Sequence, residues 1–384
     1  MKKILIEIAQ KVLLLLQFWS LAYSFVVLGL HSSSVLCSTR TPRFGSNPKI
    51  SLRRGLFERS LIILLFITFA VQSSFAAFEN SNVGVRAAAL GGAFSAMADD
   101  ATTLFFNPAG TSQLVRGEMV FNYARPFAGL NNVKINQGSL MIAGPTFEDF
   151  GIGIGATVFN ANNMYQEVQV VTNLAYQWKN LFFVPDTSFA IGGNLRFMTL
   201  KLLDLKGAIA EGDEAAKMKS MTKPTIDLGA IFRYNGFRFG VAGQNLMKAD
   251  FGIVTESTIH RETHIGAGYD FILDGKETLF EDTHFPFRVT PLIELYKRGD
   301  QDYQLSVGCE IQPFANLAFQ AGISEEKFTI GCSWGRMNVP APRDNSEELA
   351  IPSAFKPRLD IGYEFSRKVQ GDMGTPSVSL IWRF

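Results

Sequence analysis

From Gly117 onward, apolar and polar residues alternate with a period of two. In one clear case Tyr303, Leu305, Val307, Cys309 and Ile311 alternate with Gln304, Ser306, Gly308 and Glu310. This period places successive side chains on opposite faces of an extended strand, so that one face is apolar and the other is polar or glycine. Such segments begin near Gly117, Gln137, Gly151, Glu167, Thr187, Thr225, Phe237, His264, Arg288, Tyr303, Leu317, Phe328, Pro357 and Ser377. The pattern predicts an all-β fold of about 14 antiparallel strands within residues 116–384.

Three features favour a transmembrane β-barrel over a soluble β-sandwich, which also alternates: an export signal within the first 76 residues, glycines on the polar face and the form of the final segment. The strand count is also even, as bacterial single-chain barrels require, and Asn235-Gly236 is a two-residue hairpin signal between two of the segments. Glycines stand on the polar face, as at Gly151, Gly153 and Gly155, where small inward residues leave room in a lumen. The final segment, Ser377 to Phe384, is amphipathic and ends on an aromatic residue. This ending resembles the signal by which the barrel-assembly machinery recognises outer-membrane proteins.

The first 76 residues predict export. Arg53, Arg54 and Arg59 precede an apolar run over residues 61–70, and Ser74-Phe75-Ala76 provides the small residues of a cleavage site. We interpret residues 53–76 as a signal peptide, with a short membrane anchor as the alternative. Residues 1–52 contain a second apolar run and form an uncertain upstream extension, explained either by a start assigned too early or by a double leader.

Composition and charge agree with a membrane barrel and exclude several other classes. The 384-residue chain has 34 Phe and 34 Gly but only 18% charged residues, which suits a β-rich protein with a lipid-facing surface. Removing residues 1–76 leaves 27 basic and 33 acidic residues, a net charge of −6, so there is no support for nucleic-acid binding. Two remaining cysteines are too few for a disulfide framework.

The stretch from Gly84 to Gly110, GVRAAALGGAFSAMADDATTLFFNPAG, resembles the N-terminal plug of the FadL-like long-chain fatty-acid transporters, including their spirochaete-type branch. The alternative is an ordinary small-residue helical hairpin. We expect residues 77–115 to form a short helical plug in the lumen. Asp99 is predicted to cap a short helix, and Pro108 to end it by pushing Asn107 out of the helical region.

The resemblance implies passive, plug-gated diffusion of long-chain fatty acids or similar hydrophobic molecules across the bacterial outer membrane. Asp99, Asp100, Asn107, Pro108, Ala109 and Gly110 match the plug motif and are the predicted gate residues. A fatty acid also needs an apolar slot and a cation for its carboxylate. Phe105 and Phe106 are candidates for the slot, with plain packing as the alternative. Arg196, Arg233 and Arg238 are candidates for the cation, with lumen ion pairs to Asp227 or Glu310 as the alternative.

Other functions on the same fold stay open, namely a shuttle or scaffold protein in protein secretion and a simple porin. The outward loop from Leu200 to Pro224, with a short helix over residues 208–221, is predicted either to form a ligand entry groove or to be a plain surface loop. The expected partners are the hydrophobic ligand, outer-membrane lipid and the barrel-assembly machinery, with no nucleic acid.

No enzyme and no cofactor are expected. His260 and His264 lie four residues apart, but the intervening glutamate does not have the zincin spacing, so we predict no metal site. No nucleophile elbow is present, and Gly151 to Gly155 is better interpreted as a strand than as a nucleotide-binding loop.

Overall fold

A computed structural model describes residues 78, 83–129, 134–147, 149–162, 164–203, 220–252, 257–273, 287–314, 316–335, 357–367 and 373–384. The chain divides into two units, residues 1–74 and 75–384, and every described residue belongs to the second. The predicted signal peptide, the upstream extension and the connection over residues 336–356 lie outside the described residues. Within the described part of the chain, no helix is both long and apolar enough to cross a membrane.

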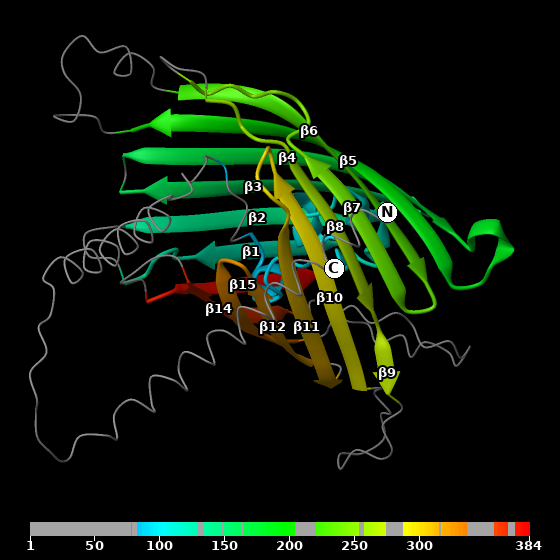
Figure 1. Cartoon of the computed structure of the whole chain (residues 1–384). Coiled ribbons are helices and arrows are strands. Elements are labelled where there is room, and N and C mark those ends of the chain that lie inside the picture. The colour runs from blue at the N-terminus through cyan, green and yellow to red at the C-terminus, as the bar shows by residue number, and fades with distance from the viewer. Residues whose placement is uncertain are drawn as a thin grey trace, which may run out of the picture. The chain divides into compact units, whose positions relative to one another are not determined.

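The strands form one closed antiparallel sheet, which confirms the predicted fold class (Figure 1). Each strand pairs with its neighbours in the sequence, and the first strand pairs with the last, from Glu118 opposite Arg383 to Ala124 opposite Ser377. The strands are β1 (Glu118–Ala124), β2 (Ile135–Pro145), β3 (Phe150–Ala161), β4 (Tyr165–Lys179), β5 (Thr187–Leu202), β6 (Ser220–Tyr234), β7 (Phe237–Gln244), β8 (Glu262–Tyr269), β9 (Phe271–Leu273), β10 (Phe287–Arg298), β11 (Gln304–Phe314), β12 (Leu317–Ser324), β13 (Lys327–Trp334), β14 (Arg358–Ser366) and β15 (Thr375–Arg383).

Of the 15 strands, β9 is a continuation of β8 beyond a break at Asp270. Both pieces pair with the same side of β10, so the barrel wall has 14 strands, as predicted. The hairpin signal is also confirmed: Asn235 and Gly236 have φ of 45° and 86°, the left-handed values that a tight two-residue hairpin turn requires.

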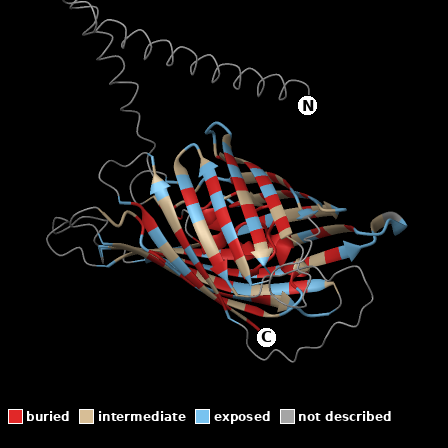
Figure 2. Cartoon of the chain, turned by 90° about the horizontal axis from the view of Figure 1, so that it is seen from below, coloured by how far each residue is buried: buried red, intermediate tan, exposed pale blue. Residues whose placement is uncertain are grey.

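In each strand the apolar residues of the alternating pattern face outward, and the polar residues face the interior of the barrel. On β11 the side chains of Leu305, Val307 and Ile311 are exposed, whereas Ser306, Glu310 and Gln312 are buried. Figure 2 shows the result as bands of buried and exposed residues that alternate along each strand. An apolar outward band is what a barrel surrounded by lipid requires.

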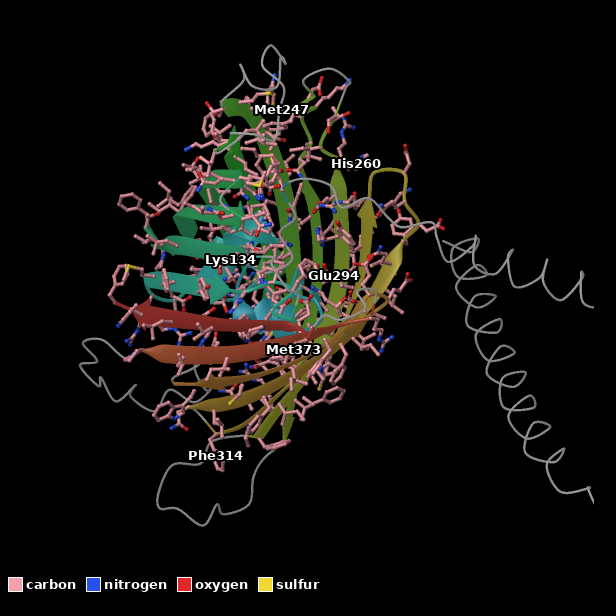
Figure 3. All side chains as sticks on the ribbon, turned by 90° about the vertical axis from the view of Figure 1, so that its left-hand side faces the viewer. Lys134, Met247, His260, Glu294, Phe314 and Met373 are labelled. Atoms are coloured by element: carbon pink, nitrogen blue, oxygen red, sulfur yellow. The ribbon has the colours of Figure 1, made fainter. Side chains whose placement is uncertain are left out.

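The two ends of the barrel differ. Gly117, Phe384 and the Asn235-Gly236 turn lie at one end, which we name the turn end. Met247 and His260 belong to the connection between β7 and β8 at the opposite end, which we name the loop end. Figure 3 shows these two residues far from Phe314, which closes β11 at the turn end. Of the predicted loop over residues 200–224, β5 includes Leu202 and β6 begins at Ser220, which rules out a helix at Ser220 and Met221; residues 204–219 lie outside the described residues.

Candidate functional site

Residues 83–114, which we name the inner segment, lie inside the barrel (Figure 1). The segment contains α3 (Val85–Ala89) and two 3-10 helices, η1 (Ala101–Phe105) and η2 (Pro108–Gln113). Upstream of it, Phe78 is buried at the loop end, where its ring lies 4.9 Å from that of Phe251. Phe78 therefore lies at the loop end and Gly117 at the turn end, and the described residues between them, 83–114, lie in the interior of the barrel.

The helix boundaries follow the predicted rules, with one correction. Asp100, not Asp99, caps η1, and its carboxylate accepts a hydrogen bond from Thr102 N at 3.1 Å. Asn107 is extended, with φ −145° and ψ 107°, so the chain leaves the helical region before Pro108 as predicted. Pro108 is then the first residue of η2, a helix that the sequence reading missed although proline favours that position.

Inward glycines of the barrel provide the space for the inner segment. A methyl group added at Gly322 would overlap the backbone of Leu90 and Gly91, and one at Gly192 would overlap the Pro108 carbonyl. Backbone atoms of the segment would be overlapped in the same way at Gly151, Gly240 and Gly308, and side-chain atoms of the segment at Gly229, Gly266, Gly331 and Gly362. The glycines on the polar face were expected to leave room in a lumen. That room is filled by the backbone of the inner segment, and the glycines permit this close approach.

Every strand of the barrel wall contacts or closely approaches the inner segment. Helices η1 and η2 pack on β2 to β6, and α3 packs on β12 to β15. The remaining strands contribute Glu118 of β1, Gln244 of β7, Gly266 of β8, Glu294 of β10 and Glu310 of β11. The segment therefore reaches around the whole inner circumference of the barrel.

Buried charges fix the first half of the inner segment. The Arg86 guanidinium pairs with Asp99 and with Glu310, with its Nε 2.6 Å from Glu310 Oε2. Asp100 accepts a hydrogen bond from Arg358 at 3.0 Å. Burial alone would raise the pKa of the Asp99 carboxyl, but the charges of Arg86 and Arg238 outweigh burial and hold this pKa well below its usual range. Asp99 and Asp100 are therefore the anionic anchors of this half.

Uncharged amides fix the second half. Asn107 is fully buried, and its Nδ2 donates to the carbonyls of Ser95 at 2.9 Å and Ala230 at 3.2 Å, while its Oδ1 accepts from Ala109 N. Gln244 donates to the carbonyls of Phe105 and Phe106 at 2.9 and 3.0 Å. Because the backbone carbonyls of an irregular segment need donors when buried, these side chains replace the regular hydrogen bonds of a longer helix.

Asn173 of β4 and Asn194 of β5 complete this set of amides. Asn173 Nδ2 lies 3.0 Å from the Pro108 carbonyl oxygen, and Asn194 Nδ2 lies 2.8 Å from that of Leu104. Gly110 is tightly enclosed, because a methyl group there would overlap the Ala98 carbonyl and the Thr103 hydroxyl. The predicted gate residues 107–110 therefore all lie in one buried, hydrogen-bonded turn.

The three candidate ligand-binding arginines differ in how many of their donors already have a protein partner. Arg196 is fully buried, pairs with Asp227 at 2.7 Å and donates to Gln169. It therefore forms the lumen ion pair that was the alternative to a carboxylate-binding role. Arg238 pairs with Asp270 and with Asp99, at 2.5 and 3.4 Å. Arg233 donates to the Met97 carbonyl at 3.0 Å, while its Nε has no hydrogen-bond partner.

The two candidate phenylalanines are packed within the interior. Phe105 is 1% exposed, and the Arg196 guanidinium lies 5.4 Å from its ring centroid. The Phe106 ring meets that of Phe94 edge to face, with centroids 5.4 Å apart. Both rings contribute to the buried apolar cluster of the inner segment.

Of the two candidate histidines, His264 supports the packing of the inner segment, whereas His260 is exposed at the loop end. His264 Nδ1 lies 2.7 Å from Glu294 Oε1, and the other oxygen of Glu294 accepts hydrogen bonds from Phe94 N and Ser95 N. Among the described residues, no group of three or more His, Cys, Asp or Glu residues could hold a metal ion. Sequence reasoning named Glu310 only as a possible partner of a lumen arginine. It missed Glu294 and Arg358 as partners of the inner segment, although their positions on the inward face were an available signal, and it missed Arg86 as the central cation of the segment itself.

Comparison with known proteins gives one family and several similar folds. The family model described as "Type IX secretion system membrane protein PorP/SprF" matches residues 100–378. The Ralstonia pickettii toluene transporter TbuX is 12% identical, with a TM-score of 0.45, and the match covers 80% of this chain and 98% of that one. A Pseudomonas aeruginosa FadL homologue is 10% identical, with a TM-score of 0.40 and coverage of 79% and 96%.

No curated protein matches the chain. The structural likenesses concern the fold alone, and the spirochaete-type branch stays a prediction. The family match spans most of the chain, including almost the whole barrel. The chain therefore belongs to the PorP/SprF family of type IX secretion system membrane proteins, as an outer-membrane β-barrel and not an enzyme.

Proposed function

We propose that this protein is a sealed outer-membrane component of a type IX secretion system, in which the inner segment acts as a plug. The family membership supports the secretion role. The observation that carries the proposal is the contact of the inner segment with all 14 strands of the wall. A porin requires an open polar lumen, whereas this interior is filled by a segment held through buried ion pairs.

In this proposal the matched motif residues hold the plug closed. Asp99 and Asp100 anchor it through Arg86, Arg238 and Arg358. Asn107, Pro108, Ala109 and Gly110 form the turn that docks on the inward face of β4 to β7. The barrel then presents its outer wall, turns and loops to partners while the outer membrane stays impermeable.

The turn end faces the periplasm in this proposal. Bacterial barrels have short periplasmic turns, and the two-residue turn at Asn235-Gly236 lies at the end where β1 begins and β15 stops. A signal peptide over residues 53–76 would deliver the chain to the periplasm, and the amphipathic last strand ending at Phe384 would be read by the barrel-assembly machinery. Outer-membrane lipid would then surround the apolar outward face.

A second candidate is plug-gated diffusion of long-chain fatty acids or other hydrophobic molecules. The observation that favours it is the apolar cluster in the plug, where Phe94, Phe105 and Phe106 gather. Displacement of the plug would expose these rings to a hydrophobic ligand. Against it, Arg196 and Arg238 are already paired with Asp227 and Asp270, and both phenylalanines lie within packed structure rather than beside a defined slot.

Deletion of the gene in its native host separates the two functions. Two quantities are measured: the secretion-system cargo in the medium and on the cell surface, and the uptake of labelled oleate. We expect secreted cargo to fall and oleate uptake to stay unchanged, and the wild-type gene should restore the cargo. Unchanged cargo together with reduced oleate uptake would contradict the secretion role and favour the second candidate.

A further inference from the structure

Three hydrogen-bond donors without acceptors lie near the turn end of the barrel. Arg288 is only 6% exposed; among the described residues its guanidinium makes no hydrogen bond or ion pair within contact distance, and the carboxylate that attracts it most is that of Asp270. Gln312 is 1% exposed, and its Nε2 has no partner. Arg233 Nε is also buried without a partner. A buried donor without an acceptor is destabilising, and more so when it is charged, so a group of such donors indicates a missing acceptor.

The sheet brings these donors together. Arg288 of β10 and Gln312 of β11 are directly opposite in the antiparallel register, so their side chains share the inward face. Arg233 of β6 is opposite Arg238 of β7. Arg238 in turn donates to Asp270, which also accepts a hydrogen bond from Thr290, two residues from Arg288. The chain of contacts joins β6, β7 and β10 into one cluster.

The carboxylates near these donors are already occupied. One oxygen of Asp270 accepts from Thr290 at 2.8 Å, and the other accepts from Arg238 Nε at 2.9 Å and from its Nη2. Glu310 accepts from Arg86 and Gln320. The donors of Arg233, Arg288 and Gln312 therefore need an acceptor from outside the described residues.

We propose that Arg288, Gln312 and Arg233 form a site for a carboxylate that enters from the periplasm. The cluster holds three guanidinium groups, of Arg233, Arg238 and Arg288, against the carboxylates of Asp99 and Asp270. A single monoanion balances this local charge, and a planar carboxylate can accept from a guanidinium and an amide at the same time. Arg233 and Asp270 are partly exposed, which gives the site a side open to solvent. The carboxylate belongs either to a polypeptide C-terminus or to a small aliphatic acid.

Calorimetric titration of the purified full-length barrel in detergent tests the site. The probes are acetyl-diglycine, its C-terminal amide, butanoate and inorganic phosphate, at constant ionic strength. We expect saturable binding of at least one carboxylate, and none of the amide. Tighter binding of acetyl-diglycine assigns a polypeptide C-terminus, and tighter binding of butanoate assigns an aliphatic acid.

Two variants connect the binding to the donors. Arg288→Gln should weaken carboxylate binding by about tenfold or more, since it removes a charge-assisted hydrogen bond. It should not lower the unfolding temperature, because Arg288 has no hydrogen bond or ion pair to lose among the described residues. The control, Arg125→Gln, changes an exposed arginine at the loop end and should leave binding unchanged.

Equal binding of acetyl-diglycine and its amide would overturn the site, as would equal weakening by the two variants. Tighter binding of phosphate than of both carboxylates would overturn the carboxylate assignment. A large drop in the unfolding temperature of Arg288→Gln would show a structural role instead. None of these results depends on secretion, so the site and the proposed function fail separately.

Discussion

The two halves of the inner segment are held in different ways. From α3 to Asp100 three ion pairs join the segment to the wall: Arg86 with Glu310, Asp99 with Arg238 and Asp100 with Arg358. From η1 through η2 the wall contacts are mainly those of amide side chains such as Asn107 and Gln244 with backbone carbonyls, beside one carboxylate, Glu118, which accepts a hydrogen bond from Ala101 N. Inward glycines serve both halves, because the backbone lies against the wall in each.

The two halves should differ in how much stability is lost when one contacting side chain is removed. A buried ion pair contributes little net stability, but loss of one partner leaves a desolvated charge and is costly. An amide contact releases one or two backbone groups and costs less. We therefore expect the charged half to decide whether the plug stays in the barrel, and the amide half to decide the exact path of its backbone.

The largest expected effect comes from Arg86→Met. This change leaves Asp99 and Glu310 without their main cation, and we expect a loss of about 3–5 kcal/mol in the free energy of unfolding. Denaturant unfolding of the detergent-solubilised protein measures it. The control Arg125→Met removes an exposed arginine and should cost less than about 0.5 kcal/mol. Equal losses in the two variants would show that the charges do not anchor the segment.

Next in size is Gly322→Ala. The added methyl group would overlap the backbone of Leu90 and Gly91, which cannot rotate away, so we expect a loss of about 1–3 kcal/mol. The matched control is Gly193→Ala, where a methyl group meets Leu228 Cδ2 at 3.4 Å and the Asp227 carbonyl oxygen at 3.6 Å, both ordinary contacts. Unfolding of both variants under the same conditions gives the comparison. A neutral Gly322→Ala would mean that the wall does not fit tightly around the segment.

A somewhat smaller loss is expected for Asn107→Ala. The change removes the cap of η2 and leaves the Ser95 carbonyl without its donor, at a cost of about 1–2 kcal/mol. Asn107→Asp keeps the capping oxygen but removes the donor, and it adds a buried charge. It should therefore be at least as destabilising as alanine. If Asn107→Asp is the more stable of the two, capping alone explains this residue.

Phe105→Leu should have the smallest effect, about 1 kcal/mol, because it keeps an apolar side chain and loses the cation–π contact with Arg196. Oleate uptake by cells that carry this variant should be unchanged if the ring only packs. A clear change in uptake at normal protein level would instead favour the ligand-slot role of the second candidate function.

Much of the wall could be predicted from the sequence, because the period-two pattern is a local property of each strand. The 14 strands, the Asn235-Gly236 turn and the break at Asn107-Pro108 follow from neighbouring residues alone. The contacts across the lumen could not be predicted, since they join residues far apart in sequence. Arg86 and Glu310 are 224 positions apart, and nothing near either residue identifies its partner.

The glycines illustrate the same limit. Their places on the inward face of several strands were visible in the sequence, but an open lumen and a closely packed inner backbone both require small residues there. Asp99 and Asp100 were similarly ambiguous: adjacent residues can each cap a helix, and the distribution of arginines in the wall decides that Asp99 pairs with Arg86 and Arg238 while Asp100 caps η1.

Ion conductance across a planar lipid bilayer tests the central claim, that the inner segment seals the barrel. Wild-type protein should insert without conductance steps, whereas a variant that lacks residues 83–114 should give stable open steps. Heat-modifiable migration on a gel would verify that both proteins are folded barrels. Steps of equal size in the wild type and in the deletion variant would contradict a sealed barrel.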